Sequence, residues 1–252
     1  MEEARQEVAR TLSSQRAMRA APLISSVKPQ AGKRASFVLC LLFGLLGLCS
    51  AGLADGAEEA ALSAAGFVEP SRLDKSIVLD IRYATDNNFT GQKVYPAARC
   101  YLRAEIAERL LKVQADLLRQ GLGLKVFDCY RPFSVQERFW SIMPDERYVL
   151  EPVRKNGAIV KSSRHNKGAA VDVTLVDVRG VELPMPTGYD DFSTKAHRDD
   201  VSASPEARKN SLLLEKAMAA QGFEPLPTEW WHFDGPGWQE YPPLDLPLPS
   251  ER

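Results

Sequence analysis

Two short segments of this chain carry residue types that could bind a divalent metal. The first runs from Ser163 to Asp172 and includes His165, and the second runs from Glu229 to His232. The chain has only 3 histidines, and two of them lie in these segments. Two imidazoles and one carboxylate, with a fourth position left for water, form the ligand set of a catalytic zinc site. We therefore predict that His165, Asp172 and His232 bind one zinc ion per chain.

The local pattern around His165 and Asp172 allows both side chains to reach one ion. His165 would lie in a loop, and Asp172 would lie in the strand that follows this loop. Gly168 and the alanines after it leave room for the backbone to turn and pack closely. The alternative for this segment alone is a surface histidine near a buried aspartate.

Glu229 could act as a base at such a site. It precedes the ligand His232 by three residues, so its carboxylate can reach a water that zinc activates and take its proton. The alternative is that Trp230 and Trp231 are core or rim aromatics and that the polar residues around them are solvated.

The sequence Asp128-Cys-Tyr-Arg131-Pro offers a candidate electrostatic clamp. A guanidinium held at the end of a strand can stabilise a developing oxyanion or bind a carboxylate with two hydrogen bonds. Arg131 is a candidate for this catalytic role. The alternative, which this segment alone favours, is a surface salt bridge between Arg131 and Asp128.

Hydrophobic periodicity predicts the elements that must position these residues. Predicted strands cover Ser76–Tyr83, Leu124–Tyr130 and Gly168–Val176, with a final strand pair in Phe223–Asp234. Predicted helices cover Leu102–Gln120, Ser134–Met143 and Pro205–Gln221. Because helices and strands do not alternate strictly, we expect an α+β fold with a small, mainly antiparallel sheet flanked by helices.

The connecting segments are also informative. Asp177–Ser204 has no clean period, and a loop of this length in a compact domain is usually functional, often as a lid. His197 lies in it, and we interpret this histidine as a loop residue and not as a ligand. Pro144–Lys161 is predicted to be an exposed, charged excursion. The proline-rich chain from Gly235 onward is predicted to wrap the surface.

The N-terminal region has the features of an export signal. Phe37–Leu48 is an uncharged apolar run, preceded by Lys33 and Arg34 and followed by small residues up to Ala54. We predict that residues 1–54 are a signal peptide with a long basic region, that 55–70 are a linker, and that 71–252 form the functional domain. The protein would be exported, with the periplasm as the expected compartment. The alternative is an uncleaved N-terminal membrane anchor.

Composition and cysteine content limit the classes of partner. The formal net charge is -1, so nothing indicates nucleic acid as a partner, and no stable membrane partner is expected after signal cleavage. Of the 4 cysteines, Cys100 and Cys129 lie beyond the signal. In an exported protein they could form a disulfide. The alternative is two buried free thiols.

The same residues carry a resemblance to a known family. Ser163-Xaa-His165-Xaa-Xaa-Gly-Xaa-Ala-Xaa-Asp172 and Glu229-Trp-Trp-His232 resemble the signature of the zinc D-Ala-D-Ala dipeptidases, a family with a member that confers vancomycin resistance. The segments that begin at Tyr83 and at Asp128 also resemble that family. The resemblance implies the fold shared by D-Ala-D-Ala metallopeptidases and the hedgehog signalling domain.

The resemblance also implies roles for individual residues. It implies zinc on the three ligands named above, Glu229 as general base and then general acid, and Arg131 as the group that stabilises the tetrahedral intermediate. It implies that Ser163 helps to bind the substrate carboxylate and that Tyr83 and Asp190 hold the substrate's free amino group. Asp190 is chosen over its neighbour Asp191, and Asp128 is counted among the substrate-binding residues.

We therefore expect an exported zinc peptidase whose substrate is the dipeptide D-Ala-D-Ala. One alternative is a carboxypeptidase or endopeptidase that trims the stem peptides of peptidoglycan, which would need an open cleft. Another is a non-catalytic zinc-binding module. Glu229 speaks against the module, because a site that only binds zinc has no need of a general base.

Overall fold

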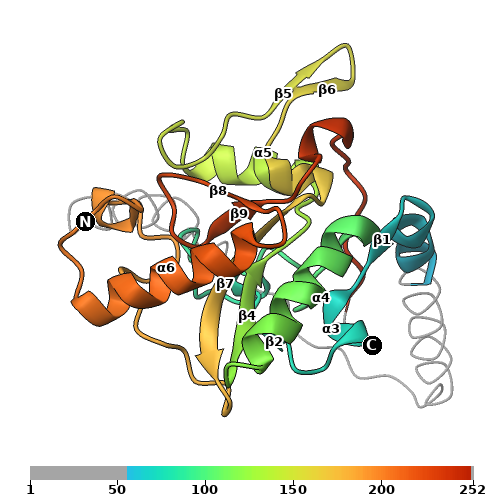
Figure 1. The fold of residues 1–252 in the computed structure, drawn as a ribbon. Coiled ribbons are helices and arrows are strands. Elements are labelled where there is room, and N and C mark those ends of the chain that lie inside the picture. Colours follow the sequence, from blue (N-terminus) through green and yellow to red (C-terminus); the bar gives the residue numbers. More distant parts are fainter. Residues whose placement is uncertain (1–55, 251–252) are drawn as a thin grey trace, which may run out of the picture. The chain divides into compact units, whose positions relative to one another are not determined.

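The computed structural model describes residues 56–250, and Figure 1 shows their fold. The predicted signal peptide, residues 1–54, lies outside the described residues. Within residues 56–250, no helix is both long enough and apolar enough to cross a membrane.

A five-stranded sheet forms the centre of the fold, with strand order β2-β4-β7-β9-β8. Three of its four strand pairs are antiparallel, and only β2 runs parallel to its neighbour β4. The strands are β2 (Val78–Leu79), β4 (Leu122–Asp128), β7 (Ala170–Asp177), β8 (Glu224–Pro225) and β9 (His232–Asp234). This confirms the predicted α+β class with a mainly antiparallel sheet.

Helices α4 (Ala104–Leu118) and α6 (Pro205–Ala219) lie side by side and pack on the sheet (Figure 1). In α4, apolar residues at helical spacing are fully buried: Ile106, Leu110, Val113 and Leu117. The Ser204 side chain caps α6 by accepting a hydrogen bond from the backbone N–H of Ala207 at 3.1 Å. The third long helix is α5 (Phe133–Ile142), which follows Arg131 directly.

The stretch expected to be a linker is part of the folded domain, so that prediction is wrong within the described residues. Residues 56–64 are helical, and Leu62 is fully buried. β1 (Phe67–Val68) pairs with β3 (Leu102–Arg103), and α3 (Pro70–Leu73) follows. Alanine-rich sequence favours a helix as much as a flexible linker, and apolar side chains at Leu62 and Phe67 anchor it to the core.

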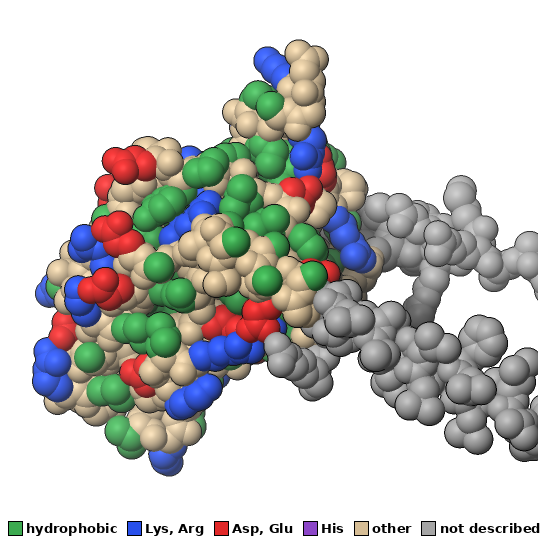
Figure 2. Space-filling view, turned by 90° about the vertical axis from the view of Figure 1, so that its right-hand side faces the viewer, with side chains coloured by type: hydrophobic (Ala, Val, Ile, Leu, Met, Phe, Trp, Pro, Cys, Tyr) green, Lys and Arg blue, Asp and Glu red, His purple; other side chains and the backbone are tan. Residues whose placement is uncertain are grey.

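Two further predictions differ from the structure in detail. In the predicted strand Ser76–Tyr83, only β2 pairs with another strand of the sheet, and Tyr83 lies in the 3-10 helix η1 (Arg82–Ala84). The predicted excursion contains the hairpin of β5 (Val153–Lys155) and β6 (Ala158–Lys161), which projects at the top of Figures 1 and 2. Asn156 and Gly157 connect these strands with positive φ angles, as a two-residue hairpin turn requires.

The chain after β9 wraps the domain as predicted. It includes the 3-10 helix η4 (Trp238–Glu240), and its Leu244 backbone N–H donates to the carbonyl of Asn166. Tyr130 bonds through its hydroxyl to the backbone of Leu246, and Leu248 is buried.

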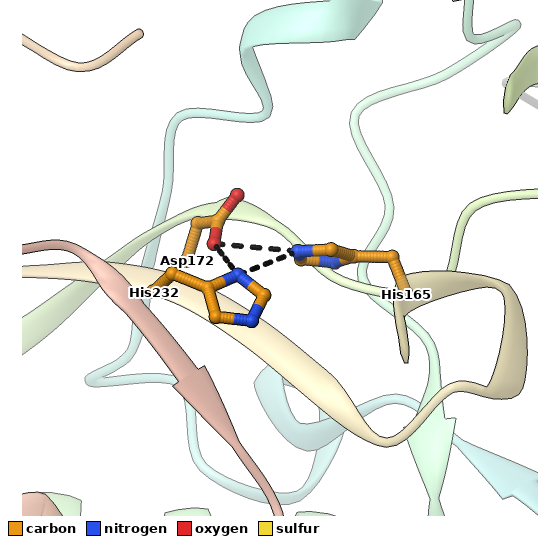
Figure 3. Close-up of side chains that lie close together, drawn as sticks. All are labelled: His165, Asp172 and His232. Atoms are coloured by element: carbon orange, nitrogen blue, oxygen red, sulfur yellow. Dashed lines mark hydrogen bonds and ion pairs between the residues drawn. The ribbon is translucent and has the colours of Figure 1, made fainter. Parts of the chain in front are cut away.

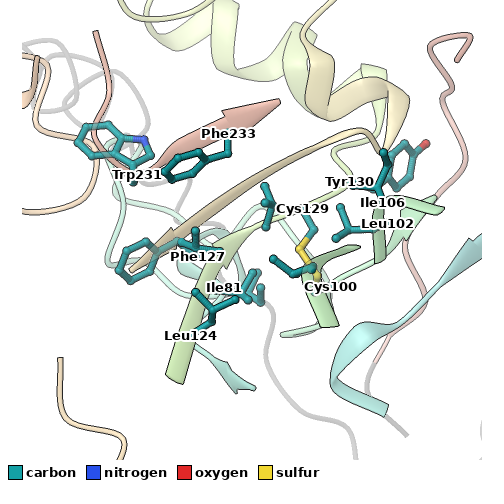
Figure 4. Packing of buried hydrophobic residues seen from close by; sticks show 14 of the residues in the cluster. Ile81, Cys100, Leu102, Ile106, Leu124, Phe127, Cys129, Tyr130, Trp231 and Phe233 are labelled. Carbon is teal, nitrogen blue, oxygen red and sulfur yellow. A yellow bond between two sulfur atoms is a disulfide. The ribbon is translucent and has the colours of Figure 1, made fainter. Parts of the chain in front are cut away.

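Cys100 and Cys129 form a disulfide inside the buried cluster, beside Leu102 and Ile106 (Figure 4). The two residues are only 1% and 2% exposed.

Candidate active site

The sheet register brings two of the predicted ligands together. Asp172 of β7 is the register partner of His232 of β9. His165 comes from the 3-10 helix η2 (Arg164–Lys167), which leads into β7. This helix ends at Gly168 with φ 67°, where a Cβ would lie 2.1 Å from the Phe67 ring. Only glycine fits this turn, so it fixes where η2 and His165 sit against the sheet.

The three ligand atoms are spaced as a metal site requires (Figure 3). His165 Nε2 lies 3.1 Å from His232 Nδ1 and 3.3 Å from Asp172 Oδ1, and His232 Nδ1 lies 2.9 Å from Asp172 Oδ1. In a tetrahedral zinc site with bonds of roughly 2.0–2.1 Å, ligand atoms are about 3.3–3.4 Å apart. The donor set and its spacing therefore fit zinc.

Hydrogen bonds at the far side of each imidazole leave the ligand nitrogens free to bind metal. His165 Nδ1 lies 2.7 Å from the carbonyl oxygen of Cys129, which can only accept, so Nδ1 carries the proton. His232 Nε2 lies 3.0 Å from Asp234 Oδ1 in the same way. Such outer partners orient ligand histidines and raise their basicity. Both histidines thus direct their other ring nitrogen, His165 Nε2 and His232 Nδ1, to the centre of the site.

The electrostatics of the site favour a positive charge at its centre. Burial acts to raise the pKa of Asp172, but His165 and His232 hold it well below its usual range. Burial acts to lower the pKa of His232, but hydrogen bonds with Asp172 and Asp234 raise it to about 10. Tyr189 donates to Asp172 Oδ2 at 2.9 Å, which leaves Oδ1 to face the histidines.

Glu229 lies beside the ligands at the edge of the pocket. Its Oε2 is 4.0 Å from His232 Nδ1, and its side chain is 26% exposed. Burial raises the pKa of Glu229, and the charge of Asp172 adds to this, against the attraction of His232. A carboxyl group in this position can exchange a proton with a molecule at the metal.

Arg131 is a buried guanidinium, not a surface one. Its Nη2 and Nε lie 2.6 and 3.2 Å from Asp128 Oδ2, and its Nη1 donates to Gln136 Oε1 at 2.7 Å. It also stacks 4.7 Å from the centre of the Phe139 ring. Arg131 is 8% exposed and lines the pocket, so its position is fixed before any substrate arrives.

Asp128 does not contact the pocket, which corrects its assignment as a substrate-binding residue. It is fully buried. Its Oδ1 accepts from the Tyr95 hydroxyl and the Cys129 N–H, and its Oδ2 accepts from Arg131. Because both of its oxygens accept hydrogen bonds inside the protein, Asp128 serves to orient Arg131 and not to contact substrate.

Tyr83 and Asp190 form a hydrogen-bonded pair that also lines the pocket. The Tyr83 hydroxyl lies 3.1 and 3.2 Å from the Asp190 carboxylate oxygens. Asp190 has a φ of 57°, an uncommon conformation for a residue other than glycine, and it lines the pocket. Asp191 instead accepts from the Ser193 N–H, so the geometry selects the first of the two acids. Burial, followed by the charges of Asp172 and Glu229, raises the pKa of Asp190 well above its usual value.

Apart from Asp128 and the two cysteines, the predicted site residues line one pocket of about 270 Å³. Ser163 lies at its edge, where its hydroxyl accepts from the His165 N–H at 3.3 Å. His197 does not line the pocket and follows the 3-10 helix η3 (Thr194–Ala196) in the long loop. Aromatic and apolar walls complete the pocket, from Phe89, Phe139, Tyr148, Val149, Leu150, Phe192, Leu226 and Trp231.

Three polar residues at the site were absent from the sequence prediction: Tyr189, Asp234 and Gln136. Asp234 could have been found, because it lies two residues after His232 and shares its face of a strand. Tyr189 adjoins Asp190, but nothing local indicates that it bonds to Asp172. Gln136 was placed in a helix start, and its bond to Arg131 depends on the turn between them.

An α+β domain that gathers two imidazoles and a carboxylate in one pocket, beside a further acid and a buried guanidinium, has the site of a metal-dependent hydrolase. The chain belongs to the D-Ala-D-Ala dipeptidase family of peptidases, whose family model matches residues 63–245.

Individual relatives agree with this assignment. The chain is 35% identical over 166 residues to the D-alanyl-D-alanine dipeptidase of Escherichia coli K12, which covers 66% of this chain and 82% of the relative. It is 31% identical over 182 residues to the enzyme of the same name from Enterococcus faecium, covering 67% of this chain and 90% of the relative. The chain is therefore a peptidase, as the sequence predicted.

Proposed function

We propose that this protein hydrolyses the dipeptide D-Ala-D-Ala to two molecules of D-alanine with one bound zinc ion. The observation that carries the proposal is the convergence of His165, Asp172 and His232 within hydrogen-bonding distance of one another, with Glu229 beside them. Membership of the dipeptidase family and the names of its relatives support the choice of substrate.

The three ligands would hold zinc through His165 Nε2, Asp172 Oδ1 and His232 Nδ1. When bound, zinc supplies Lewis acidity and makes water nucleophilic at neutral pH. The Cys129 carbonyl and the Asp234 carboxylate orient the two imidazole rings, so that His165 Nε2 and His232 Nδ1 face the position of the metal.

Glu229 acts first as the general base, which takes a proton from the attacking water. It then returns this proton to the nitrogen of the leaving D-alanine as the peptide bond breaks. Burial raises the pKa of Glu229, and this direction suits both steps. A group that accepts and then donates a proton works best when its pKa is close to the ambient pH.

Arg131 stabilises the negative charge that develops on the carbonyl oxygen. Asp128 and Gln136 hold the guanidinium in one orientation, so little reorganisation is needed in the transition state. Each of its terminal nitrogens keeps an N–H beyond these bonds, which can point to the substrate.

Two groups recognise the ends of a free dipeptide. Asp190, supported by the Tyr83 hydroxyl, binds the substrate ammonium, and Ser163 contributes to binding its carboxylate. A pocket that satisfies both charges favours a free dipeptide over a longer peptide with a blocked amino end.

We also propose that the enzyme acts outside the cytoplasm, on dipeptide released from the cell wall. The apolar run Phe37–Leu48 and its basic and small flanking residues support an export signal. Cell fractionation tests this part separately: most of the protein in the cytosol would contradict it, and a membrane-anchored form that keeps residues 1–54 would favour the uncleaved anchor over a cleaved signal.

A comparison of substrates distinguishes the proposal from a wall-trimming carboxypeptidase. Protein that begins at Asp55 would be incubated with free D-Ala-D-Ala and, separately, with a stem pentapeptide that ends in D-Ala-D-Ala. We expect cleavage of the dipeptide and little of the pentapeptide. Efficient cleavage of the pentapeptide would favour the carboxypeptidase, and bound zinc without any cleavage would favour a binding module.

A further inference from the structure

We propose that the Cys100–Cys129 disulfide is a positioning element of the zinc site, so that its formation raises the affinity of the protein for zinc. The inference rests on the proposed zinc dependence and extends it to the redox state of the chain. It arises from the place of Cys129, whose backbone touches both the ligand His165 and the residue that holds Arg131.

The main chain of Cys129 contacts both the proposed ligand His165 and Asp128, which holds Arg131. Its carbonyl oxygen accepts from His165 Nδ1 at 2.7 Å, and its N–H donates to Asp128 Oδ1 at 2.9 Å. Two residues further, the Arg131 N–H donates to the His165 carbonyl at 3.1 Å. A shift of Cys129 would therefore displace the ligand and the guanidinium together.

The sheet does not hold Cys129 by itself. The pairing of β4 with β7 is regular from Leu122 to Val126, shifts register before Asp128 and ends there. Cys129 follows that end, and its carbonyl bonds to a side chain instead of to a neighbouring strand. In the segment around Cys100, the Tyr101 carbonyl accepts from the Tyr130 N–H at 2.9 Å, and the disulfide is the covalent link beside this bond.

The disulfide also restricts the chain before it folds. It closes a loop with a sequence separation of 29 residues, which contains the whole of α4. Cross-linking a loop of this length removes conformations of the unfolded chain. In the folded state, the disulfide links Cys129, which follows the end of β4, to Cys100 in the segment before β3.

The redox step balances as a thiol–disulfide exchange. The thiols of Cys100 and Cys129 lose two electrons and two protons as their S–S bond forms, and a disulfide-bonded oxidant is reduced to its dithiol. Such exchange goes to completion in oxidising compartments and not in the cytosol. A chain still in the cytosol would then bind zinc weakly, and the exported chain would bind it at full strength.

The test measures zinc affinity by competition with a chromophoric chelator for three forms: oxidised wild type, reduced wild type and the variant Cys100→Ala. Reduction would be carried out in mild denaturant, followed by refolding with the thiols kept reduced. A matched control is Leu214→Ala, which removes a fully buried side chain of α6 that lies outside the loop. The absorption spectrum of bound Co²⁺ reports the ligand geometry independently of activity.

We expect zinc affinity to fall about 10- to 100-fold in the reduced and Cys100→Ala forms, as for the loss of other outer-shell contacts. The Co²⁺ spectrum should change, and oxidation of the reduced wild type should restore both. Leu214→Ala should lose stability but keep the affinity and the spectrum. Equal affinity and an unchanged spectrum without the disulfide would overturn the inference.

The outcomes separate this inference from the proposed function. Loss of zinc affinity on reduction, in a protein that never cleaves D-Ala-D-Ala, would support the positioning role and contradict the proposed activity. Equal zinc affinity and equal cleavage of the dipeptide in both redox states would contradict the positioning role and leave the activity intact.

Discussion

His232 Nε2 lies 3.0 Å from Asp234 Oδ1, so a proposed metal ligand and a carboxylate two residues later on the same strand form a hydrogen-bonded pair. The second carboxylate oxygen, Oδ2, lies 3.1 Å from the Nε of Arg164, the residue before the ligand His165. Asp234 therefore connects the two segments that supply the histidines.

Removal of this acceptor should weaken metal binding. We expect Asp234→Ala to lower zinc affinity by about 10- to 100-fold, because the ring of His232 loses its orientation and its proton on Nε2 loses its partner. Asp234→Asn keeps an acceptor oxygen but loses the charge. Its zinc affinity should lie between those of the wild type and Asp234→Ala. The measurement is chelator competition, with the exposed Glu240→Gln as control, and wild-type affinity in Asp234→Ala would refute the pairing argument.

Substitution of the proposed base should separate catalysis from metal binding. We expect Glu229→Ala to lower kcat for D-Ala-D-Ala by at least about 10²–10⁴-fold, the usual contribution of a positioned acid–base group. One zinc ion per chain should remain bound, because Glu229 is not among the three ligands. Glu224→Gln, on the exposed side of β8, is the matched control and should have wild-type rates. Activity that survives in Glu229→Ala would reject the base assignment.

The ammonium pocket predicts a preference for free amino ends. We expect N-acetyl-D-Ala-D-Ala to be cleaved about 10- to 100-fold more slowly than the free dipeptide in kcat/KM, because the buried Asp190 would be left without the ammonium group as its partner. In Asp190→Asn the free dipeptide should lose most of this advantage. The measurement is kcat/KM of the wild type and of Asp190→Asn for the free and for the N-acetylated dipeptide. Equal kcat/KM of the wild type for the two substrates would contradict the proposed ammonium pocket.

The sequence indicated the group of His165, Asp172 and His232, which the structure brings together, better than it indicated the shape of the site. His165, Asp172 and His232 stand in local motifs, and the buried β7 that carries Asp172 was visible as an apolar run. The connection between Asp190 and Tyr83 spans 107 positions, so no local pattern could show that the two side chains touch.

Two misjudged features have physical reasons of a similar kind. Asp128 was expected to bind substrate, but it is fully buried after the end of β4 and pairs with Arg131, and such burial depends on the tertiary fold. Residues 56–64 were predicted to be a linker because alanine and acidic residues suit solvent, yet Leu62 packs into the core. Asn156-Gly157 is, by contrast, a local signal that favours a two-residue hairpin turn.

Asp245 should make stability depend on pH. Its Oδ1 accepts from the Ser134 N–H at the start of α5 at 2.7 Å, and its Oδ2 lies 2.6 Å from Arg154. Burial acts to raise the pKa of Asp245, but these bonds lower it overall. A depressed folded-state pKa means that the stabilisation is present above the unfolded pKa of about 3.9 and is lost as pH falls through the folded value.

We therefore expect Asp245→Asn, which keeps an acceptor oxygen for the Ser134 N–H but loses the charge that pairs with Arg154, to reduce the free energy of unfolding by about 0.5 kcal/mol near neutral pH, as for a partly exposed ion pair. The difference from wild type should shrink toward zero below the folded pKa. Urea unfolding at several pH values checks this, and a difference that stays constant down to strongly acidic pH would contradict it.

The most direct test of the central claim is the release of D-alanine from D-Ala-D-Ala by protein that begins at Asp55, before and after removal of metal with a chelator. The account predicts steady release by the metal-loaded protein, loss of release with the chelator and recovery when one equivalent of zinc is returned. Release that continues at the same rate in protein proven to be free of metal would contradict the assignment of His165, Asp172 and His232 as the ligands of a catalytic zinc.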